Sequence, residues 1–545
     1  MRHSFVALVV FFAAAFAQAA ADADPALRIT AAGLLKDTKA LSDDAMGGRG
    51  PGSPGDKMAR AYLEKRLKEI GFEPGGPAGS WEQPFPIVGV SMQHPATWTF
   101  RDAKGASTAF RWWDDFIGAS GVQEPKVSIE NAEVVFVGYA IQAPEFQWDD
   151  FKGVDVKGKI LLIMNNDPDW DPKLFAGKKR LYYGRWDYKY ESAAQHGAAG
   201  AIIIHTEPSA AYGWNVVQTS WSGTSFELPR GNEAEVKLRS WMTEDAARKL
   251  VKMGGRELDA LVTAAKSRDF KPVPLGITTS IAFDVKLENT ETANVIGVLR
   301  GIDPVLRDEA MIYTAHHDHL GIGAPDAKGD KIYNGALDNA SGCAQVLAIA
   351  QAFAATSPRG KRSVVALFVG GEEQGLLGSE FYVTHPTIPL AKIAANINID
   401  GGNSFGRTSD VAIVGKGKSD LETRLTAAAK AQSRTVIDEP EPDKGYYYRS
   451  DQLNFARSGV PALYFRSGQT VIGHPAGWGK AQDDEYRKTR YHQPSDVVTP
   501  DWNFDGMVED DILAYRVGLD VVRGGPLPAW FPGDEFEAKR KLATH

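Results

Sequence analysis

Residues of the kinds that bind transition metals gather in five short clusters of this 545-residue chain. Three clusters directly follow apolar runs: His316-His317-Asp318-His319, Gly370-Gly371-Glu372-Glu373 and Asp400-Gly401-Gly402. The other two are Asp338-Asn339-Ala340-Ser341-Gly342 and Tyr491-His492-Gln493-Pro494-Ser495-Asp496. Burying so many carboxylates together costs a large free energy unless cations neutralise them. The sequence therefore predicts a site for a pair of divalent ions.

The ligand types narrow the choice of metal. Histidine combined with aspartate and glutamate, without cysteine, suits zinc or a similar transition ion. Magnesium seldom recruits two histidines, because it prefers oxygen ligands. Each cluster alone is a weak signal, since two adjacent glutamates are usually a solvated surface. The prediction depends on all five clusters lying in one domain.

An alternation of strands and helices from about residue 276 would bring the clusters together. Apolar runs predict strands at 293–299, 311–315, 363–369, 394–400, 411–414 and 462–465, and helical spacing predicts helices at 344–354, 376–383 and 421–431. Such alternation predicts an α/β fold with a mostly parallel mixed sheet and helices on both faces. Ligands bind beyond the carboxyl ends of the strands in such sheets, where three of the clusters lie.

The chain before residue 276 has a different character. Asp56 is in position to cap a helix that ends at Gly71. Strands are predicted at 134–141, 160–164 and 201–204, with a helix at 191–196 and a helical stretch at 238–265. We interpret 127–270 as a β-rich insert between a first part of the main domain, 26–126, and its larger part, 276–530. A tail follows at 531–545.

Composition and the N-terminus limit the class of protein. The formal net charge of −8 argues against a general nucleic-acid binder, which needs a basic surface. Arg2 and His3 precede an apolar run at 5–16 and then Ala17-Gln18-Ala19, the pattern of a secretory signal. This run is shorter than the roughly 20 residues that span a bilayer. We expect a signal peptide at 1–20, cleavage near Ala19, and a periplasmic or secreted mature chain without a membrane span.

Cys343 is the single cysteine of the chain. An intrachain disulfide is therefore impossible, and an exported form would depend on its core and its metals for stability. The thiol lies in an apolar run at 343–347, which predicts a small buried side chain rather than a catalytic thiol.

Five ordered motifs carry a resemblance. They are His316-x-Asp318, Gly335-Ala336-Leu337-Asp338-Asn339-Ala340-Ser341-Gly342, Gly371-Glu372-Glu373-x-Gly375-Leu376-x-Gly378-Ser379, Asn398-x-Asp400 and Tyr491-His492. Together they resemble the two-zinc aminopeptidase and glutamate carboxypeptidase family, over roughly 35–115 and 276–525. The insert resembles a protease-associated domain in the residue pattern of three segments, 134–141, 156–160 and 197–201.

The resemblance implies how the metal ligands divide. Asp338 would bridge two zinc ions, with His316 and Asp400 completing one zinc site and Glu373 and His492 the other. A water activated between the metals would attack the scissile carbonyl of a peptide.

The resemblance also gives roles to two residues that do not bind metal. Glu372 would be the general base that takes the proton of this water and returns it to the leaving amine. Asp318 would orient His316 through its free ring nitrogen. A cis bond between Asp338 and Asn339 is a further feature of the family.

The resemblance leaves the cleaved end of the peptide open. We expect an aminopeptidase, and the alternative is a carboxypeptidase or dipeptidase of the same family. A carboxylate would recognise a substrate amine, whereas an arginine such as Arg449 or Arg466 would recognise a carboxylate. The sequence does not say which of Tyr446-Tyr447-Tyr448 contacts substrate, which side chain is preferred, or what the oligomeric state is.

Other readings fit less well. The segment 316–319 lacks the H-x-H-x-D-H spacing of metallo-β-lactamases. Asp167-Pro168-Asp169-Trp170-Asp171 lacks the glycine and glutamate of a calcium loop, so we interpret it as a solvated acidic turn. A receptor-like binding protein of the same fold is disfavoured because all six metal and base positions are kept.

Overall fold

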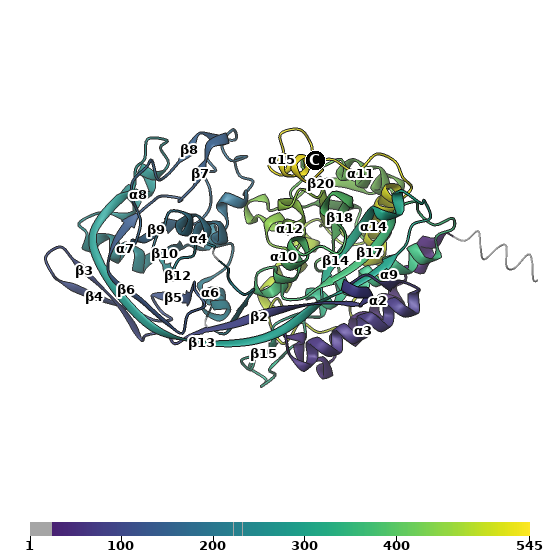
Figure 1. Ribbon diagram of the computed structural model, residues 1–545, viewed down its shortest axis with the longest axis horizontal. Helices are drawn as coiled ribbons and strands as arrows, with labels where there is room; N and C mark the ends of the chain where they lie inside the picture. The colour runs from purple at the N-terminus through teal and green to yellow at the C-terminus, as the bar shows by residue number, and fades with distance from the viewer. Residues whose placement is uncertain (1–23, 222, 232, 545) are drawn as a thin grey trace, which may run out of the picture. The chain divides into compact units, whose positions relative to one another are not determined.

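The computed structural model describes residues 24–221, 223–231 and 233–544. The signal peptide predicted at 1–20 lies outside these residues. The described chain forms two compact units (Figure 1). The first comprises the chain up to Phe85, Glu291–Glu439 and the chain from Ser450, and the second comprises Pro86–Thr290 and Pro440–Arg449. None of the helices in the described ranges combines the length and apolarity needed to cross a membrane.

The first unit is built on a mixed sheet whose central strands are parallel. Its order is β1, β13, β17, β14, β18, β21, β19 and β20, and β17, β14, β18 and β21 run parallel to one another. The strands are β1 (Glu73–Pro74), the end of β13 (Val273–Leu299), β14 (Ala310–His316), β17 (Ser363–Val369), β18 (Ile393–Asn398), β19 (Asp410–Ile413), β20 (Thr435–Asp438) and β21 (Ala462–Ser467). The predicted α/β sheet is therefore confirmed.

Helices cover both faces of this sheet. On one face, alternate residues of β14, including Met311 and Tyr313, share a core with α9 (Ser341–Ala355) and α14 (Asp505–Val522). Cys343 of α9 is buried in that core, as predicted. Successive side chains of a strand point to opposite sides of the sheet, so the remaining strand residues form its second face. Helices α10 (Leu377–Thr384) and α12 (Gln452–Arg457) cover this second face, where they contact β17, β18 and β21. Helix α11 (Leu421–Ala431) packs against α14.

The N-terminal helices α2 (Ala31–Leu41) and α3 (Pro54–Ile70) complete the α9 layer. The prediction that Asp56 caps α3 is wrong. Ser53 is the cap, and its hydroxyl accepts a hydrogen bond from the backbone N–H of Asp56 at 3.2 Å. Proline at the first helical position, Pro54, moves the start of the helix two residues upstream of Asp56. Gly71 ends the helix in the left-handed conformation, with φ 97°.

The second unit has its own mixed sheet. Its order is β5 (Phe116–Ser120), β12 (Leu238–Thr243), β10 (Gly200–His205), β9 (Ile160–Met164), β6 (Lys126–Phe136), the first part of β13, β3 (Thr97–Asp102) and β4 (Ser107–Arg111). This packing unit extends beyond the predicted insert, 127–270, on both sides. A short pairing joins β11 (Ser225–Glu227) to β2 (Glu82–Met92).

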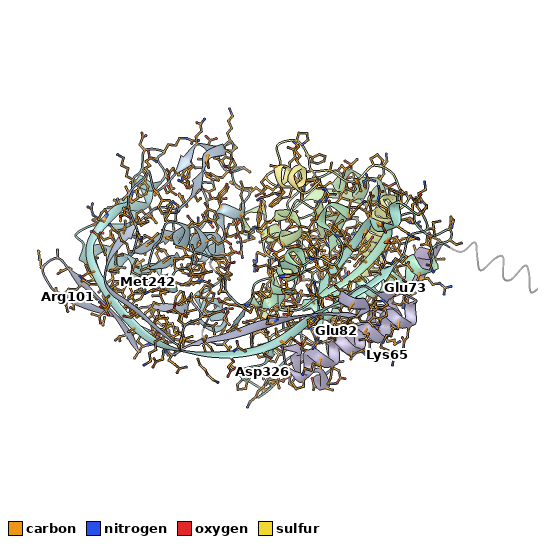
Figure 2. All side chains as sticks on the ribbon, viewed as in Figure 1. Lys65, Glu73, Glu82, Arg101, Met242 and Asp326 are labelled. Carbon is orange, nitrogen blue, oxygen red and sulfur yellow. The ribbon has the colours of Figure 1, made fainter. Side chains whose placement is uncertain are left out.

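Two cores flank the sheet of the second unit. One lies under α7 (Glu244–Met253) and α8 (Leu258–Ala265), and the other under α4 (Trp186–Gln195). Met242 of β12 is buried in the first core and Arg101 of β3 is exposed, and both are labelled in Figure 2. The helical stretch predicted at 238–265 is thus wrong in its first part. Leu238–Thr243 pairs with β10 and β5, so tertiary pairing overrides the local pattern.

The segment 165–185 of this unit is organised around buried charge. Lys189 of α4 donates to the carbonyl oxygens of Tyr139, Asn166 and Tyr183, each at 2.7 Å. Asp167 accepts from the backbone N–H of Leu181 at 2.9 Å and is 3% exposed. Burial raises the pKa of Asp167 to about 7. The prediction of a solvated acidic turn is therefore wrong for Asp167.

The remaining elements are short or peripheral. They are β7 (Gln142–Ala143), β8 (Trp148–Asp149), β15 (Gly321–Ile322), β16 (Ile332–Tyr333), α5 (Glu207–Ala210), α6 (Trp214–Trp221), α13 (Trp478–Thr489), α15 (Glu537–Thr544) and several single helical turns.

Candidate metal centre

Three neighbouring parallel strands deliver the first site residues to one edge of the sheet. Strand β14 ends on His316, β17 ends at Val369 and leads into Glu372 and Glu373, and β18 ends two residues before Asp400. In the sheet, β14 lies between β17 and β18, with His316 paired to Val369. The carboxyl ends of parallel strands share one edge, which explains why clusters distant in sequence converge.

Asp338 lies in a short turn, Ala336–Ala340, directly before α9, and its own backbone is not helical, with φ −113° and ψ 91°. The peptide bond between Asp338 and Asn339 is cis, as the family resemblance implied. Asn339 ties this turn to the end of β18. Its side chain donates to the carbonyl oxygen of Ile399 at 3.0 Å and accepts from the N–H groups of Gly401 at 2.8 Å and Gly342 at 3.0 Å.

The side chains of the predicted ligands face one another. Nε2 of His316 lies 3.2 Å from Oδ1 of Asp338 and 3.4 Å from Oδ1 of Asp400. Nε2 of His492 lies 3.3 Å from Oδ2 of Asp338 and 3.0 Å from Oε2 of Glu373. The two oxygens of Asp338 therefore face two different histidines.

The histidine nitrogens provide a test of whether a cation fits. Nε2 of both His316 and His492 is buried without a hydrogen-bond partner among the described residues. Nδ1 of His316 lies 3.2 Å from the carbonyl oxygen of Asp318, which can only accept, so Nδ1 carries the proton and Nε2 presents its lone pair to carboxylates. Lone pairs aimed at carboxylates repel unless a cation lies between them. The donor set of imidazole and carboxylate suits zinc.

Among the residues that the structure describes, two groups of ligand atoms lie close enough to hold an ion. One contains His316, Glu372 and Asp400, and the other contains His316, Asp338 and Glu373. Proximity alone therefore does not separate Glu372 from the ligands. Among the carboxylate oxygens within 4.0 Å of Nε2 of His316, Oε2 of Glu372 is the farthest, at 3.9 Å against 3.2 Å for Asp338 and 3.4 Å for Asp400.

Burial and the close carboxylates and imidazoles of the site shift the pKa values of its acidic residues. Burial raises the pKa of Glu372 well above its usual value, and the carboxylates of Asp400 and Glu373 add to this in spite of His316. Burial alone would also raise the pKa of Asp338, but the adjacent imidazoles of His316 and His492 hold it well below its usual range. The surroundings thus shift the pKa values of these two carboxylates in opposite directions, and such perturbed values are frequent at functional sites.

Asp318 holds the backbone of the glutamate pair. Its Oδ1 accepts from the N–H of Glu372 at 3.1 Å, and its Oδ2 accepts from the N–H of Glu373 at 3.3 Å. Oδ1 also lies 3.7 Å from Nδ1 of His316, farther than the carbonyl oxygen of Asp318. The residue therefore connects the β14 and β17 ends through its carboxylate and orients His316 mainly through its carbonyl.

Other residues that brace the site were not identified from the sequence. Arg49 is fully buried and donates to the carbonyl oxygens of His317 at 2.7 Å and Gly335 at 2.9 Å. Asp496 accepts from the N–H groups of Leu337 and Asp338, each at 3.1 Å. Asp496 lies in the His492 cluster, so its position in the sequence could have indicated a role at the site. Arg49 lies in a glycine-rich segment, which indicates only a break between helices.

The tyrosine cluster belongs to a different compact unit. Tyr446-Tyr447-Tyr448 lies in Pro440–Arg449, which packs with the second unit, and the N–H of Arg180 donates to the carbonyl oxygen of Pro442 at 3.0 Å. Ser450 then begins the return to the first unit, where its hydroxyl accepts from the side-chain amide of Asn398 at 2.7 Å. A substrate contact by any of the tyrosines stays a prediction.

Comparison with known proteins agrees with this geometry. Residues 294–515 match the model of peptidase family M28, and residues 129–231 match the PA domain. The chain is 27% identical over 234 residues to the probable leucine aminopeptidase 2 of Aspergillus oryzae, covering 41% of this chain and 43% of that protein. It is 31% identical over 268 residues to a probable zinc metalloprotease of Pyricularia oryzae, covering 45% and 49%. The chain thus spans about half the length of these curated relatives.

A solved structure shares the fold. The aminopeptidase from Aneurinibacillus sp. strain AM-1 matches with a TM-score of 0.51 and 19% identity, covering 92% of this chain and 97% of that chain. The shared fold and the match of residues 294–515 to the family model agree with the resemblance seen in the motifs. The match to peptidase family M28 covers residues 294–515, and the match to the PA domain precedes it at 129–231.

Proposed function

We propose that the chain is an exopeptidase that uses two zinc ions, and that it releases amino acids from the N-terminus of peptides. Support for a second metal comes from Asp338, whose oxygens lie 3.2 Å from Nε2 of His316 and 3.3 Å from Nε2 of His492. A carboxylate that faces two separate histidines is suited to bridge two ions. This observation carries the proposal.

In the proposed reaction each residue has one task. Asp338 would be shared, His316 and Asp400 would hold one zinc, and Glu373 and His492 the other. Bound zinc supplies Lewis-acid activation of water and of the scissile carbonyl. Glu372 takes the proton of the attacking water at its carboxylate and delivers it to the leaving amine. Burial raises the pKa of Glu372, which is the direction expected for a carboxylate that acts as a general base near neutral pH.

The aminopeptidase assignment is tested by offering both ends of a peptide. Purified protein loaded with zinc would be assayed on aminoacyl-nitroanilides and on N-blocked peptides with free carboxylates. We expect turnover of the former only, and zinc analysis giving two ions per chain. Cleavage of blocked peptides alone would favour the carboxypeptidase or dipeptidase alternative. Metal-loaded protein without turnover of either class would favour a receptor-like binding protein.

We also propose that the chain is exported, on the signal-like pattern at 1–20. Expression of the full chain followed by cell fractionation and N-terminal sequencing tests this. A mature N-terminus near residue 20 in the exported fraction is expected, and an uncleaved intracellular chain would contradict the proposal.

A further inference from the structure

His319 ends the cluster that follows β14, yet it is neither a predicted ligand nor the base. Its side chain is fully buried, with 0% of its surface exposed. Its Nδ1 lies 2.6 Å from Oε1 of Glu373. An ionised carboxylate only accepts hydrogen bonds, so Nδ1 of His319 is the donor.

The two oxygens of Glu373 therefore lie in different surroundings. Oε1 accepts from His319, whereas Oε2 lies 3.0 Å from Nε2 of His492. A carboxylate held in this way presents a single oxygen to a metal. If the Glu373 carboxylate rotated to offer both oxygens to a metal, the hydrogen bond from His319 would break.

The backbone around His319 fixes its ring in place. A Cβ atom at Gly335 would lie 2.5 Å from Cγ of His319, so the ring packs directly against a backbone that has φ +56°. The N–H of His319 donates to the carbonyl oxygen of Arg49 at 3.3 Å. Its ring lies edge-on to that of His492, with centroids 5.6 Å apart. Little room remains for another orientation.

The hydrogen bonding distinguishes His319 from an ordinary core histidine. Within the described chain, Nε2 of His319 is buried and has no hydrogen-bond partner. A histidine that served only to fill the core would gain from satisfying both nitrogens, because an unpaired buried polar atom costs free energy. The position of the ring therefore serves one hydrogen bond, from Nδ1 of His319 to Oε1 of Glu373.

We propose that His319 is a positioning residue that fixes Glu373 as a one-oxygen ligand and so sets the affinity of the metal position formed by Glu373, His492 and Asp338. The position formed by His316 and Asp400 would depend on it little. The proposal rests on the proposed function only in taking two metal positions. Loss of the outer partner of a metal ligand typically weakens binding by about 10–100-fold, which is the expected effect here.

The test compares variants that keep or remove the donor. His319→Asn places an amide nitrogen near the position of Nδ1, whereas His319→Leu fills space without a donor. The exposed His474→Leu is the control. Metal-free protein would be titrated with zinc against a coloured chelator, and Co²⁺ absorption would report the two positions separately. Thermal unfolding of each metal-free variant checks that it is folded.

The expected result is selective. His319→Leu should weaken one of two zinc-binding steps by about 10–100-fold and leave the other unchanged, while His319→Asn and His474→Leu stay close to wild type. Unchanged binding in His319→Leu would overturn the proposal, as would equal weakening of both steps in His319→Leu and His319→Asn. A single binding step in the wild type would instead contradict the two-zinc function itself. Failure of peptidase activity with two intact steps would contradict only the reaction.

Discussion

At the scale of single residues, Glu372 and Glu373 are neighbours with different partners. Oε2 of Glu373 lies 3.0 Å from Nε2 of His492, and Oε1 accepts from His319. The carboxylate of Glu372 is 3.9 Å from Nε2 of His316, and burial raises its pKa. Adjacent residues thus diverge because the left-handed Gly371, with φ 73°, starts a tight turn in which their side chains leave in different directions.

The first prediction concerns Glu372→Gln. We expect this variant to retain two zinc ions per chain but to lose turnover by about 10²–10⁴-fold, because glutamine has the shape of glutamate but accepts no proton. Metal analysis and kcat on an aminoacyl-nitroanilide measure the two effects. The exposed Asp308→Asn removes the same charge and should leave both unchanged. A Glu372→Gln variant with full turnover would show that another group is the base.

The ligand types and their place at strand ends could be predicted from the sequence, but the bracing residues could not. His316, Asp338 and Asp400 stand in recognisable motifs. The role of Arg49 depends on a hydrogen bond across 268 residues, to the carbonyl oxygen of His317. Backbone acceptors have no signature in side-chain type, so a sequence pattern does not reveal which guanidinium will find them.

At the scale of secondary-structure elements, the start of α9 must lie against the end of β18. A Cβ atom at Gly342 would lie 2.1 Å from Oδ1 of Asn339 and 2.6 Å from the carbonyl oxygen of Ile399. Gly342 has an ordinary helical backbone, so the close approach of these atoms, and not a special conformation, requires glycine at this position. This close approach places the turn that carries Asp338 directly against Ile399, the residue before Asp400.

The second prediction is that Gly342→Ala separates these two elements. We expect a loss of about 1–3 kcal/mol in the free energy of unfolding, typical of overpacking, and weaker zinc binding. Denaturant unfolding and chelator competition measure the two effects. Gly525→Ala is the matched control, because a Cβ atom at Gly525 meets nothing within 4 Å. Equal stability of the two variants would contradict the argument.

The third prediction concerns α4 and the segment it holds in the second unit. Lys189→Met removes the donor shared by the carbonyl oxygens of Tyr139, Asn166 and Tyr183. We expect the unit to lose about 3–5 kcal/mol, because breaking a buried charge network leaves its partners uncompensated. Hydrogen exchange of peptides from 137–190 should accelerate. The exposed Lys178→Met should leave exchange unchanged. Unaltered exchange in Lys189→Met would mean that the carbonyl cage does not hold this segment.

Most elements near the site could be predicted because their apolar periods are strong. The strand at 363–369 and the helix at 421–431 have the predicted bounds. Leu238–Thr243 was missed because its alternation is short and continues without a break into α7, so only pairing with β10 and β5 identifies it as a strand. Ser53 was missed as a cap because proline usually breaks a helix. Pro54 nevertheless occupies the first helical position, where proline is tolerated.

At the scale of the whole molecule, the chain has separate cores in its two compact units. The core of the first unit contains α9, α14 and β14, and the cores of the second lie on either side of β9, β10 and β12. The predicted metal ligands all belong to the first unit. Binding of metal should therefore stabilise the first unit directly, because a ligand stabilises the state that binds it.

The fourth prediction is that removal of metal affects the two units unequally. At free zinc 100-fold above the dissociation constant, binding contributes about 2.7 kcal/mol per ion, which chelation removes. Metal also compensates the repulsion among Asp338, Glu373 and Asp400, so exchange should accelerate most in peptides around 316–342, 370–376 and 398–402. Hydrogen exchange with and without chelator, in the full chain, measures this. Peptides from 127–165 and 238–285 serve as internal controls, since they hold no predicted ligand. Equal acceleration in those peptides would show that the second unit depends on the metal as well, contradicting independent cores.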